Sequence, residues 1–177
     1  MTAILRFVGI LNAAVWCGAS IFLVIALPAV FSDALKSKIG PMGPPGVGWA
    51  AEAIFARYFL LQYFCAGIGL AHLALESLCC GKPFWRRNLA ILGFLLALAL
   101  AGGLWMQPKL NDLHQTKYFG PTRAAQEQAD HAFKAWHGAS ECGNLVVMGG
   151  LLVYLWRISR VSEQARYGTL NLGKIRG

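Results

Sequence analysis

Residues 135–156 read AWHGASECGNLVVMGGLLVYLW and combine two kinds of sequence in one helix-sized stretch. The segment from Cys142 to Trp156 has no charged residue, which is typical of a helix in a membrane. Just before or within it stand His137, Ser140, Glu141 and Asn144. At 100° per residue these four side chains fall within an arc of about 100° and share one helix face. The stretch predicts a membrane helix that carries a polar face at one end.

The overall composition also indicates a membrane protein. The chain has 177 residues, 56% of them hydrophobic and 14% charged, whereas soluble domains carry about 25% charged residues. The net charge of +8 does not point to a nucleic-acid partner, because the basic residues flank apolar runs instead of forming one patch. Five cysteines without a C-x-x-C pair are typical of small packing residues. The lack of C-x-x-C-H excludes covalently attached haem.

Four stretches are apolar enough to cross a bilayer, which takes about 20 residues as a helix. We expect helices over residues 4–31, 52–80, 88–107 and 121–158, the third of them ending at Pro108. These spans must be helices because backbone groups in lipid have to bond within their own segment. The predicted fold class is all-α, an integral membrane four-helix bundle. We expect one transmembrane domain over residues 1–177, with a flexible basic tail at 159–177.

The connections between the expected helices differ in character. The first, KSKIGPMGPPGVGWA at residues 36–50, is so rich in Gly and Pro that we expect no regular helix there. The third connection has Pro121 where a helix can start and small or aromatic residues at helical spacing. We expect the fourth helix to extend outward and to pack against a continuation of the third helix through Leu113. The result is an outward helical hairpin between the third and fourth spans.

Basic residues set the expected orientation. The short loop GKPFWRR at residues 81–87 and the tail after Trp156 are dense in Lys and Arg close to helix ends. Such residues collect on the cytoplasmic side of a membrane. We therefore predict a protein of the cell (inner) membrane with cytoplasmic N- and C-termini.

Polar residues that share helix faces predict two clusters. On the second helix, Gln62, His72 and Glu76 fall within an arc of about 80°. A charge that faces lipid costs at least ~3 kcal/mol, so we expect the polar faces to turn into the bundle. The outer cluster comprises Arg57, Gln62, His137, Ser140, Glu141 and Asn144, and the inner cluster comprises Asn12, His72 and Glu76.

Each cluster has more than one interpretation. Arg57 and Glu141 would form a structural ion pair; the same cluster would also suit an ion, a proton or another ligand, or contact a protein partner. His72 and Glu76 are four residues apart and would interact directly. Alternatively, His72 would be a single axial haem ligand, since no second histidine is expected at its depth.

Two patterns concern the remaining helices. On the third helix, Gly93, Ala97 and Ala101 repeat every four residues, which predicts the close approach of a neighbouring helix. In the hairpin, His114 and His131 are expected at different heights, which argues against a metal ion shared between them.

The sequence carries no recognisable catalytic motif. It has no nucleophile triad, phosphate loop, H-E-x-x-H or dinucleotide fingerprint, and we predict no catalytic residue, metal ligand or cofactor. The predicted function is that of an accessory subunit of a membrane complex, or of a small carrier-like or structural membrane protein. The alternatives are a haem- or pigment-binding protein that uses His72, and an ion- or proton-handling protein that uses the outer cluster. The expected partners are the lipid bilayer and other membrane subunits or a second copy of the chain.

Short motifs in all four spans resemble those of one family. WHGASECGNL is similar to the H-G-x-S-x-x-x-N-L segment that opens the last helix of the transmembrane protein 205-like family, and LWMQPKLNDL, FARYFLLQYFCAG and AVWCGASIFLVIALPAVF resemble its other helices. The chain departs from that pattern at Gln107, where an acidic residue is usual, and in its Gly/Pro-rich first loop. The resemblance implies a four-helix membrane protein of poorly defined biochemistry, linked in animal members to resistance to platinum compounds. It implies motif positions without catalytic roles: Pro108, His137, Gly138, Ser140, Asn144 and Leu145.

Overall fold

The computed structural model describes the chain except for residues 1, 31, 34–36, 39–42, 81–85 and 172–177. The helices of the described residues are α1 (Thr2–Val30), α3 (Gly43–Cys80), α4 (Arg86–Leu100), the π-helix η2 (Ala101–Met106), α5 (Gln107–Phe119) and α6 (Arg123–Asn171). Because α4, η2 and α5 follow one another without a break, the described chain contains four helices long and apolar enough to span a membrane. The predicted all-α, four-helix membrane fold is confirmed.

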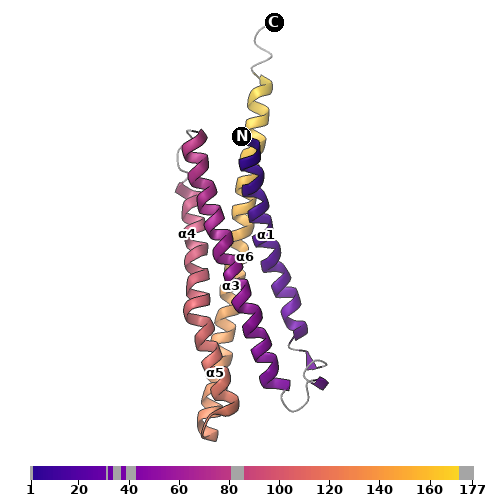
Figure 1. Cartoon of the computed structure of the whole chain (residues 1–177), viewed down its shortest axis with the longest axis vertical. Coiled ribbons are helices and arrows are strands. Elements are labelled where there is room, and N and C mark those ends of the chain that lie inside the picture. Colours follow the sequence, from indigo (N-terminus) through magenta and orange to yellow (C-terminus); the bar gives the residue numbers. More distant parts are fainter. Residues whose placement is uncertain (1, 31, 34–36, 39–42, 81–85, 172–177) are drawn as a thin grey trace.

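The four helices form an elongated bundle (Figure 1). Contacts join α1 to α3 and α6, and join α4 to α3 and α6, so each helix touches two neighbours in a ring. The start of α1 and the end of α6 lie at one end of the bundle, and the turn between α5 and α6 lies at the other. We call these the termini end and the hairpin end.

Large side chains fill the centre of the bundle. Trp16 of α1 and Tyr154 of α6 are fully buried and meet Leu92, Leu95 and Leu151 in one continuous core. Most of the outward surface of the spans is also apolar, with exposed residues such as Phe22 and Phe64. A bundle that is apolar both inside and outside is what a lipid environment requires.

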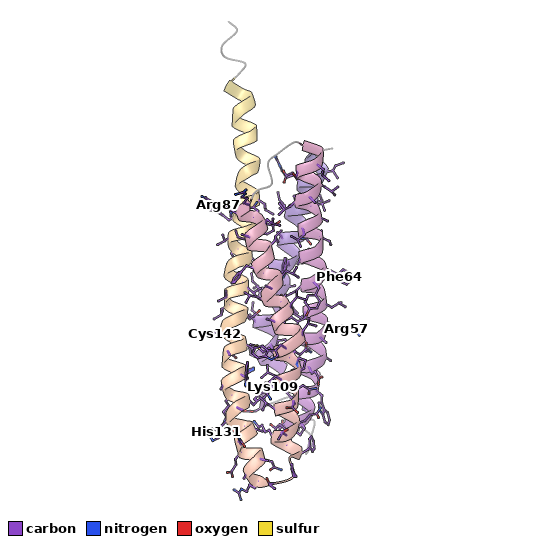
Figure 2. The ribbon with its side chains drawn as sticks, turned by 90° about the vertical axis from the view of Figure 1, so that its left-hand side faces the viewer. Arg57, Phe64, Arg87, Lys109, His131 and Cys142 are labelled. Carbon is purple, nitrogen blue, oxygen red and sulfur yellow. The ribbon has the colours of Figure 1, made fainter. Side chains whose placement is uncertain are left out.

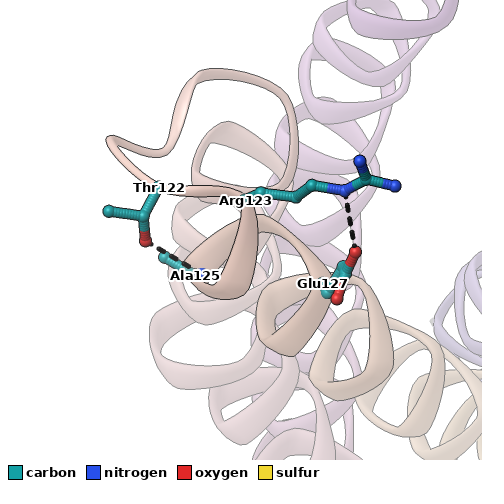
Figure 3. Close-up of polar contacts among 4 residues, drawn as sticks. All are labelled: Thr122, Arg123, Ala125 and Glu127. Atoms are coloured by element: carbon teal, nitrogen blue, oxygen red, sulfur yellow. Dashed lines mark hydrogen bonds and ion pairs between the residues drawn. The ribbon is translucent and has the colours of Figure 1, made fainter.

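The expected hairpin between the third and fourth spans is confirmed, and a polar network fastens it. Asp130 of α6 lies 2.6 Å from the Nζ atom of Lys117 on α5 and 2.6 Å from that of Lys134. The turn ends at Thr122, whose hydroxyl accepts a hydrogen bond from the Ala125 N–H at 3.2 Å (Figure 3). Because Thr122 supplies this cap, α6 begins at Arg123 and not at Pro121.

The Gly/Pro-rich connection is partly helical, contrary to the prediction. Helix α3 begins at Gly43, nine residues before the expected start at residue 52. Pro44 and Pro45 stand in the first turn, where a helix has no partner for their missing N–H groups. The extension packs against the hairpin, with Trp49 stacked 6.3 Å from Phe119. Residues 36 and 39–42 of the same connection lie outside the described part.

The third span does not stop at Pro108. Its helix passes through η2 into α5, and the Gln107 N–H bonds to the Gly102 carbonyl in the wider spacing of a π-helix. Pro108 stands at the start of α5 and has no backbone N–H to donate. The wider turn of the π-helix just before it accommodates this break in the hydrogen-bond pattern.

The end of the last helix is also longer than expected. Helix α6 continues to Asn171, whereas the sequence predicts a flexible tail from residue 159. The segment from Arg160 to Tyr167 contains no proline or glycine, which permits the helix to continue. Residues 172–177 of the tail lie outside the described part.

Candidate functional site

Tyr58 joins three helices toward the hairpin end of the bundle. Its hydroxyl oxygen lies 3.0 Å from Ser20 Oγ on α1 and 3.1 Å from Asn144 Oδ1 on α6. Ser20 in turn donates to the Trp16 carbonyl at 3.0 Å, and the Gln62 amide lies beside the Tyr58 hydroxyl. A tyrosine hydroxyl carries one hydrogen, so it can donate to only one of Ser20 and Asn144 at a time.

Beside this tyrosine lies a cavity of about 590 Å³. Its walls come from α1, α3, the α4–η2 segment and α6, and most of the lining side chains are apolar, such as Leu23, Leu98 and Val147. The polar lining side chains come from α3 and α6: Tyr58, Gln62, His137, Ser140, Glu141 and Asn144. The structure therefore gathers five of the six predicted outer-cluster residues around one space.

His137 and Glu141 lie at the mouth of this cavity. His137 Nε2 is 3.3 Å from Glu141 Oε1, and the Glu141 side chain is 68% exposed. The His137 ring stacks on Phe133, with the ring centres 5.7 Å apart. Ser140 Oγ donates to the main-chain oxygen of His137 at 2.7 Å. Because this hydroxyl bonds the backbone and not the imidazole, Ser140 and His137 do not form a nucleophile–base pair.

A smaller cavity of about 100 Å³ adjoins the first one toward the hairpin. The two cavities share six lining residues, namely Phe55, Phe59, Gly102, Met106, His137 and Ser140. Glu52 also lines the smaller cavity, and its carboxylate accepts a hydrogen bond from Asn111 Nδ2 at 2.8 Å. Polar groups thus continue from the large cavity toward the hairpin end.

The π-helix η2 forms part of the wall of both cavities. A Cβ atom at Gly102 would lie 2.7 Å from the Phe59 ring, and one at Gly103 would lie 2.0 Å from the Tyr63 hydroxyl. Glycine at both positions leaves room for the Phe59 and Tyr63 side chains of α3. π-Helical turns are rare and occur frequently at functional sites, in agreement with the position of η2 beside the cavities.

A family profile described as a domain of unknown function, DUF4149, matches residues 11–118. The chain belongs to the DUF4149 family. The matched segment of this DUF4149 protein contains Tyr58 and Gln62 and ends before Glu141 on α6. No curated protein and no solved structure matches the chain.

One predicted member of the outer cluster lies elsewhere in this DUF4149 protein. Arg57 is exposed on α3 and points away from the bundle (Figure 2). It does not line the large cavity, and Glu141 contacts His137 instead. The expected pairing of Arg57 with Glu141 is therefore not formed, because Arg57 is five residues from Gln62 and lies about 140° around the helix.

The three predicted inner residues are not joined into one hydrogen-bonded group in the DUF4149 chain. Asn12 Nδ2 donates to the Cys65 carbonyl at 2.9 Å and links α1 to α3. His72 is 6% exposed, and neither of its ring nitrogens has a hydrogen-bond partner. Glu76 is half-buried and acts electrostatically on Tyr154. His72 and Glu76, which we expect to interact directly, are not joined by a hydrogen bond.

The residue that sequence analysis missed in the DUF4149 site is Tyr58. It stands four residues before Gln62, about 40° away on the same helix face, so the face that predicted Gln62 also contains it. Of the hairpin histidines, His114 is buried against Gly48 and His131 is exposed (Figure 2). The described residues contain no group of three or more His, Cys, Asp or Glu side chains placed to hold a metal ion.

Proposed function

We propose that this DUF4149 protein is a carrier-like integral membrane protein that holds a small, largely apolar molecule in the large cavity. The cavity of about 590 Å³ carries this proposal. Ligand pockets are commonly 300–1,000 Å³, with apolar walls and a few polar groups that fix the orientation of the ligand. The large cavity has that composition, with the polar groups on α3 and α6 only.

The proposed localisation and orientation of the protein rest on the sequence. We place the protein in the cell (inner) membrane, with both termini in the cytoplasm and the hairpin end outside. The chain acts as one transmembrane domain, and the resemblance to the transmembrane protein 205-like family agrees with a bundle of this kind. The role is non-enzymatic, supported by Ser140, whose hydroxyl is engaged by a backbone carbonyl.

Gly143 offers a direct test, because it lines the large cavity and a Cβ atom there would meet nothing within 4 Å. The substitution Gly143→Phe would fill the cavity from its α6 wall without a clash at Cβ. Gly149 is the matched control: it lies on the same helix, its Cβ position is also open, and it is not among the residues that line the cavity.

The experiment compares wild type, Gly143→Phe and Gly149→Phe, each purified from native membranes in mild detergent. Small molecules extracted from the three samples are identified by mass spectrometry. We expect one species to accompany the wild type and Gly149→Phe in constant proportion and to be lost from Gly143→Phe. Equal content of every small molecule in all three samples would contradict the proposal.

A second candidate role, that of an accessory subunit, is favoured by the outer face of α4. Gly93 and Ala97 are exposed, and a Cβ atom at Gly93 would meet nothing within 4 Å, so no described helix packs on this part of the predicted stripe. Its third member, Ala101, belongs to η2 and lines the large cavity. Small residues let another membrane helix approach closely. Cross-linking in native membranes tests this role: Ala97→Phe should reduce the yield of any cross-linked partner, and an unchanged pattern would argue against it.

Haem binding at His72 gains no support from the packing of this ring. A Cβ atom at Gly9 of α1 would lie 2.6 Å from His72 Nε2, so α1 already occupies the space next to that nitrogen. An absorption spectrum of the purified protein tests the point. A stoichiometric Soret band that disappears in His72→Ala would restore the haem hypothesis.

A further inference from the structure

The charge that lines the cavities is opposite in sign to that of the whole chain. The chain has a net charge of +8, yet no Lys or Arg lines either cavity. The charged residues that do line them are Glu141 at the large cavity and Glu52 at the small one. We infer that the large cavity takes an apolar organic cation, a conclusion that rests on the proposed function and names its ligand class.

Several of the described basic residues near the hairpin end either point outward or contact a carboxylate outside the cavities, as Lys109 does with Asp112. Arg57 points outward from α3 (Figure 2), and Lys117 and Lys134 both contact Asp130. The contacts of the two cavity carboxylates are made by uncharged donors or by histidine: Asn111 contacts Glu52, and His137 contacts Glu141. No Lys or Arg of either cavity wall contacts these carboxylates, so a cation in the large cavity would meet the carboxylate of Glu141.

Aromatic side chains of α3 supply a second attraction for a cation. Phe55, Tyr58 and Phe59 all line the large cavity. The face of an aromatic ring attracts a positive charge, most strongly where water is excluded. The same rings provide apolar surface for the body of the ligand, which favours an organic cation over a small hydrated ion.

Gln62 provides an independent observation at the inner part of the cavity. It lines the cavity and is only 2% exposed, and its Oε1 atom has no hydrogen-bond partner. A buried acceptor without a donor is costly. A ligand that carries N–H or O–H donors would satisfy this oxygen, whereas an anion would bring another acceptor to it.

Two probes of the same shape and opposite charge separate this inference from the proposed function. Tetraphenylphosphonium is an apolar cation, and tetraphenylborate is the corresponding anion. Binding of each probe to the purified full chain is measured by equilibrium dialysis at a fixed detergent concentration. Gly143→Phe is measured in parallel, so that partition into the micelle is subtracted.

The variant Glu141→Gln tests the carboxylate, and Glu127→Gln is its control. Glu127 lies on the same helix, is exposed, and contacts Arg123 outside the cavities, so both variants change the net charge equally. We expect wild type to bind the phosphonium and not the borate. Glu141→Gln should weaken phosphonium binding by up to about fivefold, the range for an exposed charge, and Glu127→Gln should leave it unchanged.

The other outcomes are equally decisive. Borate binding as tight as phosphonium binding, or an equal loss in both glutamine variants, would overturn the cation inference and leave the cavity function standing. Binding of neither probe, together with equal small-molecule content in wild type and Gly143→Phe, would overturn both.

Discussion

The hydroxyl of Tyr58 on α3 lies 3.1 Å from the amide oxygen of Asn144 on α6. These residues are 86 positions apart in the chain, and the same hydroxyl also contacts Ser20 on α1. One side chain of α3 therefore reaches partners on both α1 and α6 at the wall of the large cavity, and donates to one of them at a time.

Tyr58→Phe is expected to destabilise the bundle by about 0.6 kcal/mol for the contact with Asn144, the average for interhelical hydrogen bonds in membranes. A double-mutant cycle with Asn144→Ala, followed by unfolding in mixed detergent micelles, measures this coupling. The control is Tyr63→Phe, because the Tyr63 hydroxyl donates to the Ala99 carbonyl over a longer 3.4 Å. Zero coupling between positions 58 and 144 would show that the hydrogen bond does not join the helices.

Gly48→Ala is expected to disturb the packing of α3 on the hairpin. A Cβ atom at Gly48 would lie 2.0 Å from His114 Nε2, and overpacking of this kind costs about 1–3 kcal/mol. Gly67→Ala on the same helix is the control, since its Cβ would meet nothing within 4 Å; alanine there should be neutral or stabilising by up to about 1 kcal/mol. Thermal unfolding compares the two variants. Equal stability would mean that the His114 side chain moves away from the new Cβ atom at little cost in free energy.

Asp130→Asn is expected to lower the melting temperature at low salt, because it removes the carboxylate that contacts both Lys117 and Lys134. The difference from wild type should shrink at high salt as screening increases. Glu127→Gln breaks only the exposed contact with Arg123 at 3.1 Å (Figure 3) and should have little effect. A salt-independent loss in Asp130→Asn would indicate a packing defect instead of a lost charge interaction.

The proposed orientation is tested by cysteine labelling. Ala124 is exposed beside the hairpin turn, so Ala124→Cys should react with a membrane-impermeant maleimide added to intact cells. Ser162→Cys, beyond the last span, should react only after the membrane is opened. Wild type gives the background from the native cysteines. Labelling of Ser162→Cys but not Ala124→Cys in intact cells would reverse the orientation.

The sequence was sufficient for the spans, the hairpin and most of the outer cluster, because hydrophobic length and helical periodicity determine them. Gln62 and Asn144 were placed on inward faces by angle, and both line the cavity. The sequence also predicts Arg57 in this cluster, yet it does not line the cavity. Its angle of about 140° from Gln62 already places it on another face of the helix, and without Arg57 the charged residue that remains at the large cavity is Glu141.

Other features depend on contacts that no single segment reveals. The π-helix η2 lies where Gly102 and Gly103 approach Phe59 and Tyr63 of α3, which are distant in sequence. The Gly/Pro-rich start of α3 lies beside a hairpin formed later in the chain, with Trp49 on Phe119. Local propensity favours a loop at that position, and tertiary packing overrides it.

The length of α3 bears on the route by which a molecule could reach Tyr58. Its apolar span runs from Gly43 to Leu78, about 54 Å at 1.5 Å per residue, whereas the hydrocarbon layer is about 30 Å thick. Measured back from Leu78, 30 Å ends at about Tyr58. With Leu78 taken as one edge of that layer, Glu141 would lie level with the lipid head groups, where an amphipathic solute concentrates. Such a solute would reach the cavity by lateral diffusion along the leaflet.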